Sequence, residues 1–232
     1  GWWSRGLGDV YKRQELNKQN GIHTAILADL QGPKIRVGDF AKPLNLKKGQ
    51  IIEFSTKKRK GTVYINYQEF ARDVKENDKV LLDDGKIVLK VQRSNKIDSV
   101  ILKVEFGGIL HSRKGVNLPN TSISLPCLTK KDLSDLKFIL NQDIEWVGLS
   151  FVRKSKDVLD LRKKLKLKKS TIKIIAKIEK PEAISNIDDI IDVTDAIMVA
   201  RGDLGVEVPP QKVPVYQKMI VNKCISKSRP VI

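Results

Sequence analysis

The chain has 232 residues, 41% of them hydrophobic, and its 44 lysines and arginines against 27 aspartates and glutamates give a formal net charge of +17. This length and apolar content are enough for a packed core, which excludes a disordered chain. No apolar run approaches the roughly 18 residues of a membrane span, and the N-terminus lacks the unbroken apolar stretch of a signal peptide. We therefore expect a cytoplasmic protein with no membrane partner.

The positive charge suggests nucleic acid binding, but the residue types do not support it. The chain has 33 lysines and only 11 arginines, whereas surfaces that read bases or stack on them usually need arginine and aromatic side chains. The densest basic stretch has no interleaved aromatic residue and carries lysines at positions 163, 164, 166, 168 and 169. We expect a solvated, lysine-rich surface that attracts anionic ligands, and no nucleic acid partner.

The character of the N-terminal region changes at Glu15. Residues 1–14 show neither the alternation of a strand nor the apolar stripe of a helix, so we interpret them as a non-native tail. From Glu15 the pattern predicts the end of a helix, a stop at Gly21 and a strand over 23–30. This helix-to-strand step, over 15–36, is the first part of an α/β domain.

A small all-β domain is predicted over 37–119, where short alternating runs are separated by turn residues. Two runs show the alternation most clearly: Ile87, Leu89 and Val91, and then Val100, Leu102, Val104 and Phe106. Asp83, Asp84 and Gly85 form a turn between strands. The length of this segment lies within the usual range for a domain.

The remainder, 120–232, alternates between strand and helix patterns. Strands are predicted over 146–151, 172–178, 196–200 and from residue 230 onward. Helices are predicted from the N-cap Thr129 and over 155–167, 181–191 and 210–227. Such alternation indicates parallel βα units. The chain stops at Ile232 within a strand, so we expect it to be part of a longer protein.

Charged residues end two of these strands. Lys177 and Glu179 share one face of the strand over 172–178, and Asp203 follows the strand over 196–200. The carboxyl ends of parallel strands line the mouth of a barrel or the crevice of a sheet. Two carboxylates beside a lysine suit Mg²⁺ with an anionic substrate, because Mg²⁺ takes few protein oxygens and keeps positions for water and phosphate. A structural ion pair beside a glycine turn is the alternative.

Four segments resemble the signatures of the pyruvate kinase family, in that family's order. They are Ala28-Asp29-Leu30-Gln31-Gly32-Pro33-Lys34-Ile35-Arg36, Lys114-Gly115-Val116-Asn117-Leu118-Pro119, Ile175-Ala176-Lys177-Ile178-Glu179 and Ala200-Arg201-Gly202-Asp203-Leu204-Gly205. The resemblance covers Glu15 to Ile232. It implies an α/β fold, a partial (β/α)₈ TIM barrel, with 15–36 as its third strand, 37–119 as an inserted β-barrel lid and 120–232 as about strands 4 to 7.

The resemblance assigns the reacting centre to the strand ends. Lys177 resembles the catalytic lysine that stabilises the transferring phosphoryl group and the enolate. Glu179 and Asp203 resemble the ligands of Mg²⁺, or of Mn²⁺ in its place. Gly202 and Asp203 would offer backbone N–H groups to the carboxylate of phosphoenolpyruvate.

The resemblance assigns nucleotide contacts to the ends of the inserted domain. Arg36 resembles a catalytic arginine that contacts the nucleotide and the transferring phosphate. Lys114 resembles a hinge lysine near the phosphates of ADP or ATP. Asp83 and Asp84 look like a lid turn, with a plain solvated turn as the alternative.

The monovalent cation site departs from the family pattern. Asp29 resembles a K⁺ ligand, but Lys34 occupies a position where K⁺-dependent members carry glutamate. An ammonium group can supply the single positive charge locally, so we do not expect a requirement for K⁺.

The predicted function is phosphoryl transfer from phosphoenolpyruvate to ADP, the last step of glycolysis, in a protein that is a homotetramer at full length. The family's early arginine, asparagine and serine segment should precede Glu15, and its threonine on the protonation side should follow Ile232. We therefore expect this chain by itself to be inactive. The alternatives are another Mg²⁺-dependent barrel enzyme that acts on phosphoenolpyruvate or an enolate, and a lysine-rich binding module without enzymatic activity.

Overall fold

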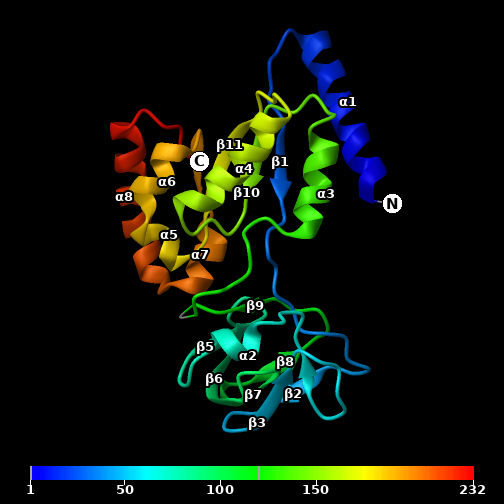
Figure 1. The fold of residues 1–232 in the computed structure, drawn as a ribbon, viewed down its shortest axis with the longest axis vertical. Helices are drawn as coiled ribbons and strands as arrows, with labels where there is room; N and C mark the ends of the chain where they lie inside the picture. Colours follow the sequence, from blue (N-terminus) through cyan, green and yellow to red (C-terminus); the bar gives the residue numbers. More distant parts are fainter. Residues whose placement is uncertain (1, 120) are drawn as a thin grey trace. The chain divides into compact units, whose positions relative to one another are not determined.

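The computed structural model describes residues 2–119 and 121–232, with side chains from Val10 onward. The chain forms two compact units (Figure 1). The first unit contains the residues up to Gly32, Cys127–Ala200 and Tyr216–Ile232, and the second contains Pro33–Pro126 and Arg201–Val215. Each unit has its own sheet structure and its own buried core.

A parallel sheet forms the centre of the first unit. Its strands are β1 (Leu27–Leu30), β10 (Trp146–Leu149), β11 (Lys173–Ile178) and β12 (Ala196–Val199), paired in that order. A parallel bridge from Ile197 to Val231 continues the sheet beyond β12. Leu149 and Ile174 are fully buried, as expected for strands with helices packed around the sheet. The strands predicted up to residue 200 are confirmed, although β1 begins at Leu27 and not at residue 23, and β10 ends at Leu149 and not at residue 151. The strand predicted from residue 230 onward is present as the single bridge at Val231.

Helices alternate with these strands: α3 (Lys130–Ile139), α4 (Ser155–Leu167), α5 (Pro181–Ser185), α6 (Ile187–Val193) and α8 (Val213–Ser226). Thr129 caps α3 as predicted, because its Oγ1 accepts the N–H of Asp132 while the Asp132 carboxylate accepts the N–H of Thr129. Within the described residues, no helix is both long and apolar enough to cross a bilayer.

The prediction of one helix over 181–191 is wrong, because α5 and α6 meet at Asn186. The Asn186 side chain donates to the carbonyl oxygens of Arg153 at 2.9 Å and Glu182 at 3.0 Å. An asparagine that bonds to nearby backbone groups competes with the helical hydrogen-bond pattern. The predicted helix over 210–227 likewise begins with a separate 3₁₀ turn, Pro210–Lys212, before α8.

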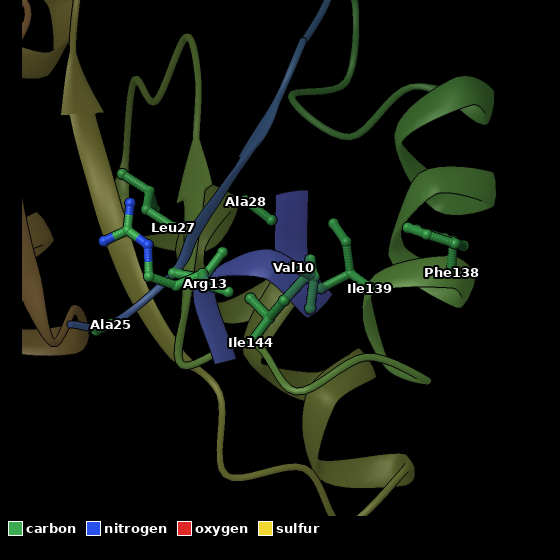
Figure 2. Close-up of a pocket in the computed structure, with 9 residues that line it drawn as sticks. Val10, Arg13, Ala25, Leu27, Ala28, Phe138, Ile139 and Ile144 are labelled. Carbon is green, nitrogen blue, oxygen red and sulfur yellow. The ribbon is translucent and has the colours of Figure 1, made fainter. Parts of the chain in front are cut away.

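The N-terminal region forms one helix, α1 (Trp2–Asn20), which crosses the predicted boundary at Glu15. Val10 is buried, and Gln14 Nε2 donates to Asp143 Oδ2 at 3.0 Å. Together with β1 and α3, α1 borders a largely apolar cavity of about 400 Å³ (Figure 2). The lack of a helical pattern over 1–14 was therefore misleading, while the non-native origin of that segment stays a prediction.

The second unit is built on antiparallel strands. Its larger sheet has the order β4-β3-β7-β6-β5-β9, and β2 pairs with β8 in a smaller one. The strands are β2 (Leu44–Leu46), β3 (Ile51–Ser55), β4 (Val63–Tyr64), β5 (Lys79–Leu82), β6 (Ile87–Ser94), β7 (Ser99–Phe106), β8 (Gly108–Leu110) and β9 (Val116–Asn117). Two short helices, α2 (Phe70–Asp73) and α7 (Arg201–Glu207), complete the unit.

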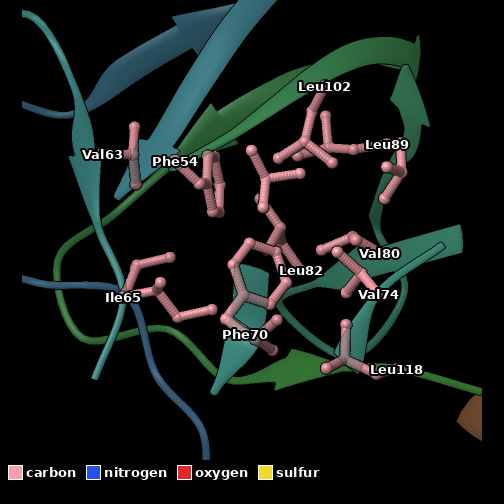
Figure 3. Close-up of a cluster of buried hydrophobic side chains, with 14 of the residues drawn as sticks. Phe54, Val63, Ile65, Phe70, Val74, Val80, Leu82, Leu89, Leu102 and Leu118 are labelled. Atoms are coloured by element: carbon pink, nitrogen blue, oxygen red, sulfur yellow. The ribbon is translucent and has the colours of Figure 1, made fainter. Parts of the chain in front are cut away.

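The core of the second unit follows the predicted alternation, with one exception. Leu89 and Leu102 are fully buried beside Phe54 and Phe70 (Figure 3). Phe106, which was predicted to lie on one face of a strand with Val100, Leu102 and Val104, is exposed while these three are buried. The register between β6 and β7 shifts just before it, since Val88 pairs with Phe106 but the next residue pairs with Val104. A β-bulge of this kind re-aims the side chains beyond it.

Gly32 closes the turn after β1 in a conformation that other residues rarely adopt. Its φ is +69°, and a Cβ atom there would lie 2.7 Å from Cδ2 of Phe151 and 3.3 Å from Cβ of Ser150. The buried carboxylate of Asp132 accepts its N–H at 3.1 Å. The turn after β1 is therefore held closely against the turn after β10.

We expect Gly32→Ala to lower the free energy of unfolding by roughly 3 kcal/mol, since left-handed strain and overpacking each cost about 1–2 kcal/mol. Gly21→Ala is a matched control, because Gly21 ends α1 at φ +63° with nothing within 4 Å of a Cβ atom. It should lose only the strain contribution, about 1–2 kcal/mol. Urea unfolding of both variants measures the difference, and equal losses would show that Phe151 moves aside without cost.

Candidate active site

Three side chains surround the ammonium group of Lys177, which lies near the carboxyl end of β11. Lys177 Nζ is 3.0 Å from Asp29 Oδ2, 3.2 Å from Glu179 Oε1 and 2.9 Å from Ser150 Oγ. These residues lie at or just past the carboxyl ends of β1, β10 and β11, where parallel strands gather their side chains at one edge. The Lys177 side chain is only 13% exposed. The structure thus brings together three of the predicted site residues.

Asp29 reaches Lys177 because the residue beside it in the sheet is a glycine. Asp29 pairs with Gly148 in the register of β1 and β10. A Cβ atom on Gly148 would lie 3.0 Å from Asp29 Oδ1, so a side chain there would crowd the carboxylate. Neither Gly148 nor Ser150 was predicted as a site residue, and the available signal was a glycine and a serine near the end of a predicted strand.

Glu179 is a buried carboxylate with a backbone partner. Its side chain is 2% exposed, and Oε2 accepts the N–H of Phe151 at 3.0 Å while Oε1 faces Lys177. Phe151 has a left-handed backbone with φ 56°, which costs a residue with a side chain about 1–2 kcal/mol. A buried carboxylate needs such partners, because an uncompensated charge in the interior is strongly destabilising.

The charge of Lys177 is set by opposing effects. Burial lowers its pKa, but the negative charge of Glu179 and the hydrogen bond to Asp29 together raise it more. The pKa of Lys177 therefore lies above its ordinary value of 10.5. A fixed positive charge at this edge of the sheet can stabilise an anionic group at neutral pH.

In the second unit, the two predicted nucleotide-contacting residues lie on adjacent segments. Arg36 bridges to Gly115, the neighbour of Lys114, and the N–H of Val37 donates to the Lys114 carbonyl at 3.0 Å. Arg36 Nη1 donates to the carbonyl of Arg113 at 2.8 Å. The entry and exit of the inserted domain are thus joined, and each contributes a cation.

Asp83 is the partner of Lys114. Its carboxylate is 2.8 Å from Lys114 Nζ and 3.3 Å from Lys86 Nζ, and its side chain is 12% exposed. The hydrogen bond from Lys114 holds the pKa of Asp83 below its ordinary value. Asp83, Asp84 and Gly85 all have positive φ, as a tight turn between strands requires, and the role of this turn as a lid stays a prediction.

Gly202 and Asp203 lie in the first turn of α7, in the second unit, and both are exposed. Within the described ranges, no three His, Cys, Asp or Glu side chains are grouped so that they could hold a metal ion. The carboxylates of Glu179 and Asp203 nevertheless have the oxygen chemistry that suits Mg²⁺, which often takes only one or two protein carboxylates. Their joint role as ligands stays a prediction.

The raised pKa of Lys177 predicts that its ammonium stays charged between about pH 6 and pH 9. The charged form then stabilises the fold below about pH 10.5, and this contribution is lost as the pH rises through the higher folded-state pKa. Glu179→Gln should lower the pKa of Lys177, because the substitution removes the negative charge that raises this pKa, while the burial that lowers it remains. Glu182→Gln, at an exposed residue of α5, is the control and should leave it unchanged.

Nuclear magnetic resonance titration of proteins with ¹³C-labelled lysine Cε, with the Lys177 signal assigned from Lys177→Met, provides the measurement. A Lys177 pKa below 10.5 in the unsubstituted protein would contradict this electrostatic account.

Comparisons with known proteins identify the family of this chain. The sequence profile of the family described as "Pyruvate kinase, barrel domain" matches residues 7–232. The match begins inside the segment that we interpret as a non-native tail, and not at Glu15.

Several curated pyruvate kinases are also similar to the chain. The protein from Clostridium acetobutylicum is 44% identical over 95% of this chain and 47% of its own length. The enzyme from Thermotoga maritima is 39% identical over the whole chain and 50% of its own length. "Pyruvate kinase PKLR" from Rattus norvegicus is 41% identical over 90% of the chain and 38% of its own length. The chain thus spans half or less of the length of these relatives, and it belongs to the pyruvate kinase family.

Proposed function

We propose that a full-length protein carrying this chain transfers the phosphoryl group of phosphoenolpyruvate to ADP, giving pyruvate and ATP. The observation that supports this most is the cluster of Lys177, Glu179 and Asp29 at the carboxyl edge of the parallel sheet, in a chain of this family. The family match also favours this function over other Mg²⁺-dependent barrel enzymes and over a binding module.

Lys177 supplies fixed positive charge in this proposal. Phosphoryl transfer depends mainly on positioning and on neutralising the charge of the transferring group. The P–O bond to the enol oxygen breaks while an oxygen of ADP bonds to phosphorus, so negative charge collects on the enol oxygen, and Lys177 would stabilise this charge. The enolate then takes a proton at its methylene carbon and becomes pyruvate. A preorganised ammonium in a partly buried site stabilises this developing charge.

Glu179 and Asp203 would hold the divalent cation, Mg²⁺ or Mn²⁺. When bound, the cation neutralises the oxygens of the substrate as a Lewis acid. Glu179 is suited to this role, because the N–H of Phe151 already fixes one of its oxygens. Gly202 and Asp203 would add backbone N–H groups for the substrate carboxylate.

Arg36 and Lys114 would bind the phosphates of ADP and ATP. Lys114 is paired with Asp83, so a phosphate oxygen would replace that carboxylate. When a phosphate oxygen replaces the Asp83 carboxylate, the positive charge of Lys114 keeps a negatively charged partner. Arginine suits phosphate because its planar group can donate two parallel hydrogen bonds.

The same proposal includes the oligomeric state and the cellular compartment of the full-length protein. We expect it to be a homotetramer of the cytoplasm. We also expect the 232-residue chain by itself to be inactive, because within the described residues β1 is an edge strand of the parallel sheet, with β10 as its one neighbour.

Lys177→Met tests the proposed function in a full-length protein with a coupled assay of pyruvate formation. We expect kcat to fall on the order of 10²- to 10³-fold, with a small change in KM for phosphoenolpyruvate, because the lysine acts on charge that develops during transfer. Lys173→Met, on the same strand over the ring of Trp146, is the matched control and should stay within about twofold of wild type. An increased KM with unchanged kcat would make Lys177 a ground-state anchor.

Lys34 provides a test of the cation requirement. Its side chain is exposed, and we propose that its ammonium takes the place of K⁺. The full-length enzyme should then work with tetramethylammonium as the only monovalent cation, and Lys34→Glu should create a requirement for K⁺. Lys42→Glu, at an exposed lysine of the same unit, should not. Activation of the unsubstituted enzyme many-fold by K⁺ would return Asp29 to the role of a K⁺ ligand.

A further inference from the structure

Ser150 lies next to the ammonium of Lys177, although nothing in the sequence pattern assigns it a role. It follows β10 directly and is 3% exposed. Its Oγ accepts a hydrogen bond from Lys177 Nζ at 2.9 Å and donates one to Asp29 Oδ1 at 3.4 Å. The hydroxyl group therefore joins the two charged groups.

The backbone of the turn after β10 is fixed independently of this hydroxyl. The carbonyl of Ser150 accepts a hydrogen bond from the buried thiol of Cys127 at 3.0 Å. The next N–H, of Phe151, donates to Glu179. Gly32 allows the neighbouring turn to lie against both residues. The Ser150 hydroxyl is thus held on a turn that has its own supports.

The three partners of Lys177 differ in their exposure to solvent. An ammonium group has three donors, and here they face Ser150, Glu179 and Asp29. Ser150 and Glu179 are almost fully buried, whereas the Asp29 side chain is 57% exposed. An incoming anion can displace Asp29 much more readily than the other two. Ser150 and Glu179 would then keep the ammonium in place while the third donor turns to the substrate.

We propose that Ser150 is a positioning residue, whose hydroxyl holds the Lys177 ammonium in the orientation that phosphoryl transfer needs. This inference rests on the proposed function. A lysine has a flexible four-carbon stem and a point charge, so its usefulness to a transition state depends on what restrains it. A small misplacement of a catalytic group can reduce the rate about 10²-fold.

The first experiment compares Ser150→Ala with Ser170→Ala in the full-length protein. Ser150→Ala should lower kcat about 10- to 100-fold, as expected for loss of one hydrogen bond to a charged group, and change KM for phosphoenolpyruvate less than about threefold. Ser170 Oγ accepts the N–H of Ile172 at 3.2 Å, after α4, so its variant controls for removal of a hydroxyl. The kcat of Ser170→Ala should stay within about twofold of wild type. Thermal unfolding of both variants shows whether each of them is folded.

The second experiment is a double-mutant cycle with Lys177→Met. If Ser150 acts through Lys177, Ser150→Ala should lower the residual rate of the Lys177→Met protein by less than about twofold. An equal loss in both backgrounds would show that Ser150 acts independently, which overturns the proposal. A kcat of Ser150→Ala equal to that of wild type would overturn it as well.

These outcomes are distinct from a failure of the proposed function. A folded, unsubstituted protein that forms no pyruvate from phosphoenolpyruvate and ADP would refute the proposed function itself. An active unsubstituted protein with an unaffected Ser150→Ala variant would refute only the positioning role.

Discussion

The cost of removing an ammonium group from water governs the architecture around Lys177. A buried charge is tolerated only with close partners of opposite charge and satisfied hydrogen bonds. Glu179 supplies the charge, and the N–H of Phe151 satisfies its second oxygen. Phe151 adopts a left-handed backbone there, and Gly32 leaves space for its ring. The backbone strain at Phe151 and the absence of a side chain at Gly32 are thus both associated with the ion pair between Lys177 and Glu179.

Features that depend on short stretches of sequence could be predicted. The capped start of α3 at Thr129 follows from the residue types within one helical turn. The stop at Gly21 follows from its positive φ at the end of α1, where the N–H of Ile22 donates to the Asn17 carbonyl. Lys177 and Glu179 could be placed together because alternation along a strand fixes their common face.

Features that depend on the pairing of distant segments could not be predicted. The place of Ser150 beside Lys177 results from the register of β10 against β11, and that of Gly148 from the register against β1. The exposure of Phe106 results from a bulge that alternation does not reveal. The continuation of α1 through residues 2–14 was missed, because a helix without a clear apolar stripe lacks the signal on which such predictions depend.

The buried thiol of Cys127 has a consequence for resistance to oxidants. Burial raises the pKa of Cys127 well above its ordinary value, and the negative charge of Asp157 adds to the effect. The thiolate is the form that reacts with peroxides and alkylating agents. A thiol that stays protonated is therefore chemically inert, although it supports the turn that carries Ser150. The fold thus uses a sulfur atom to support the turn beside Lys177 and keeps that sulfur in the form that oxidants attack least.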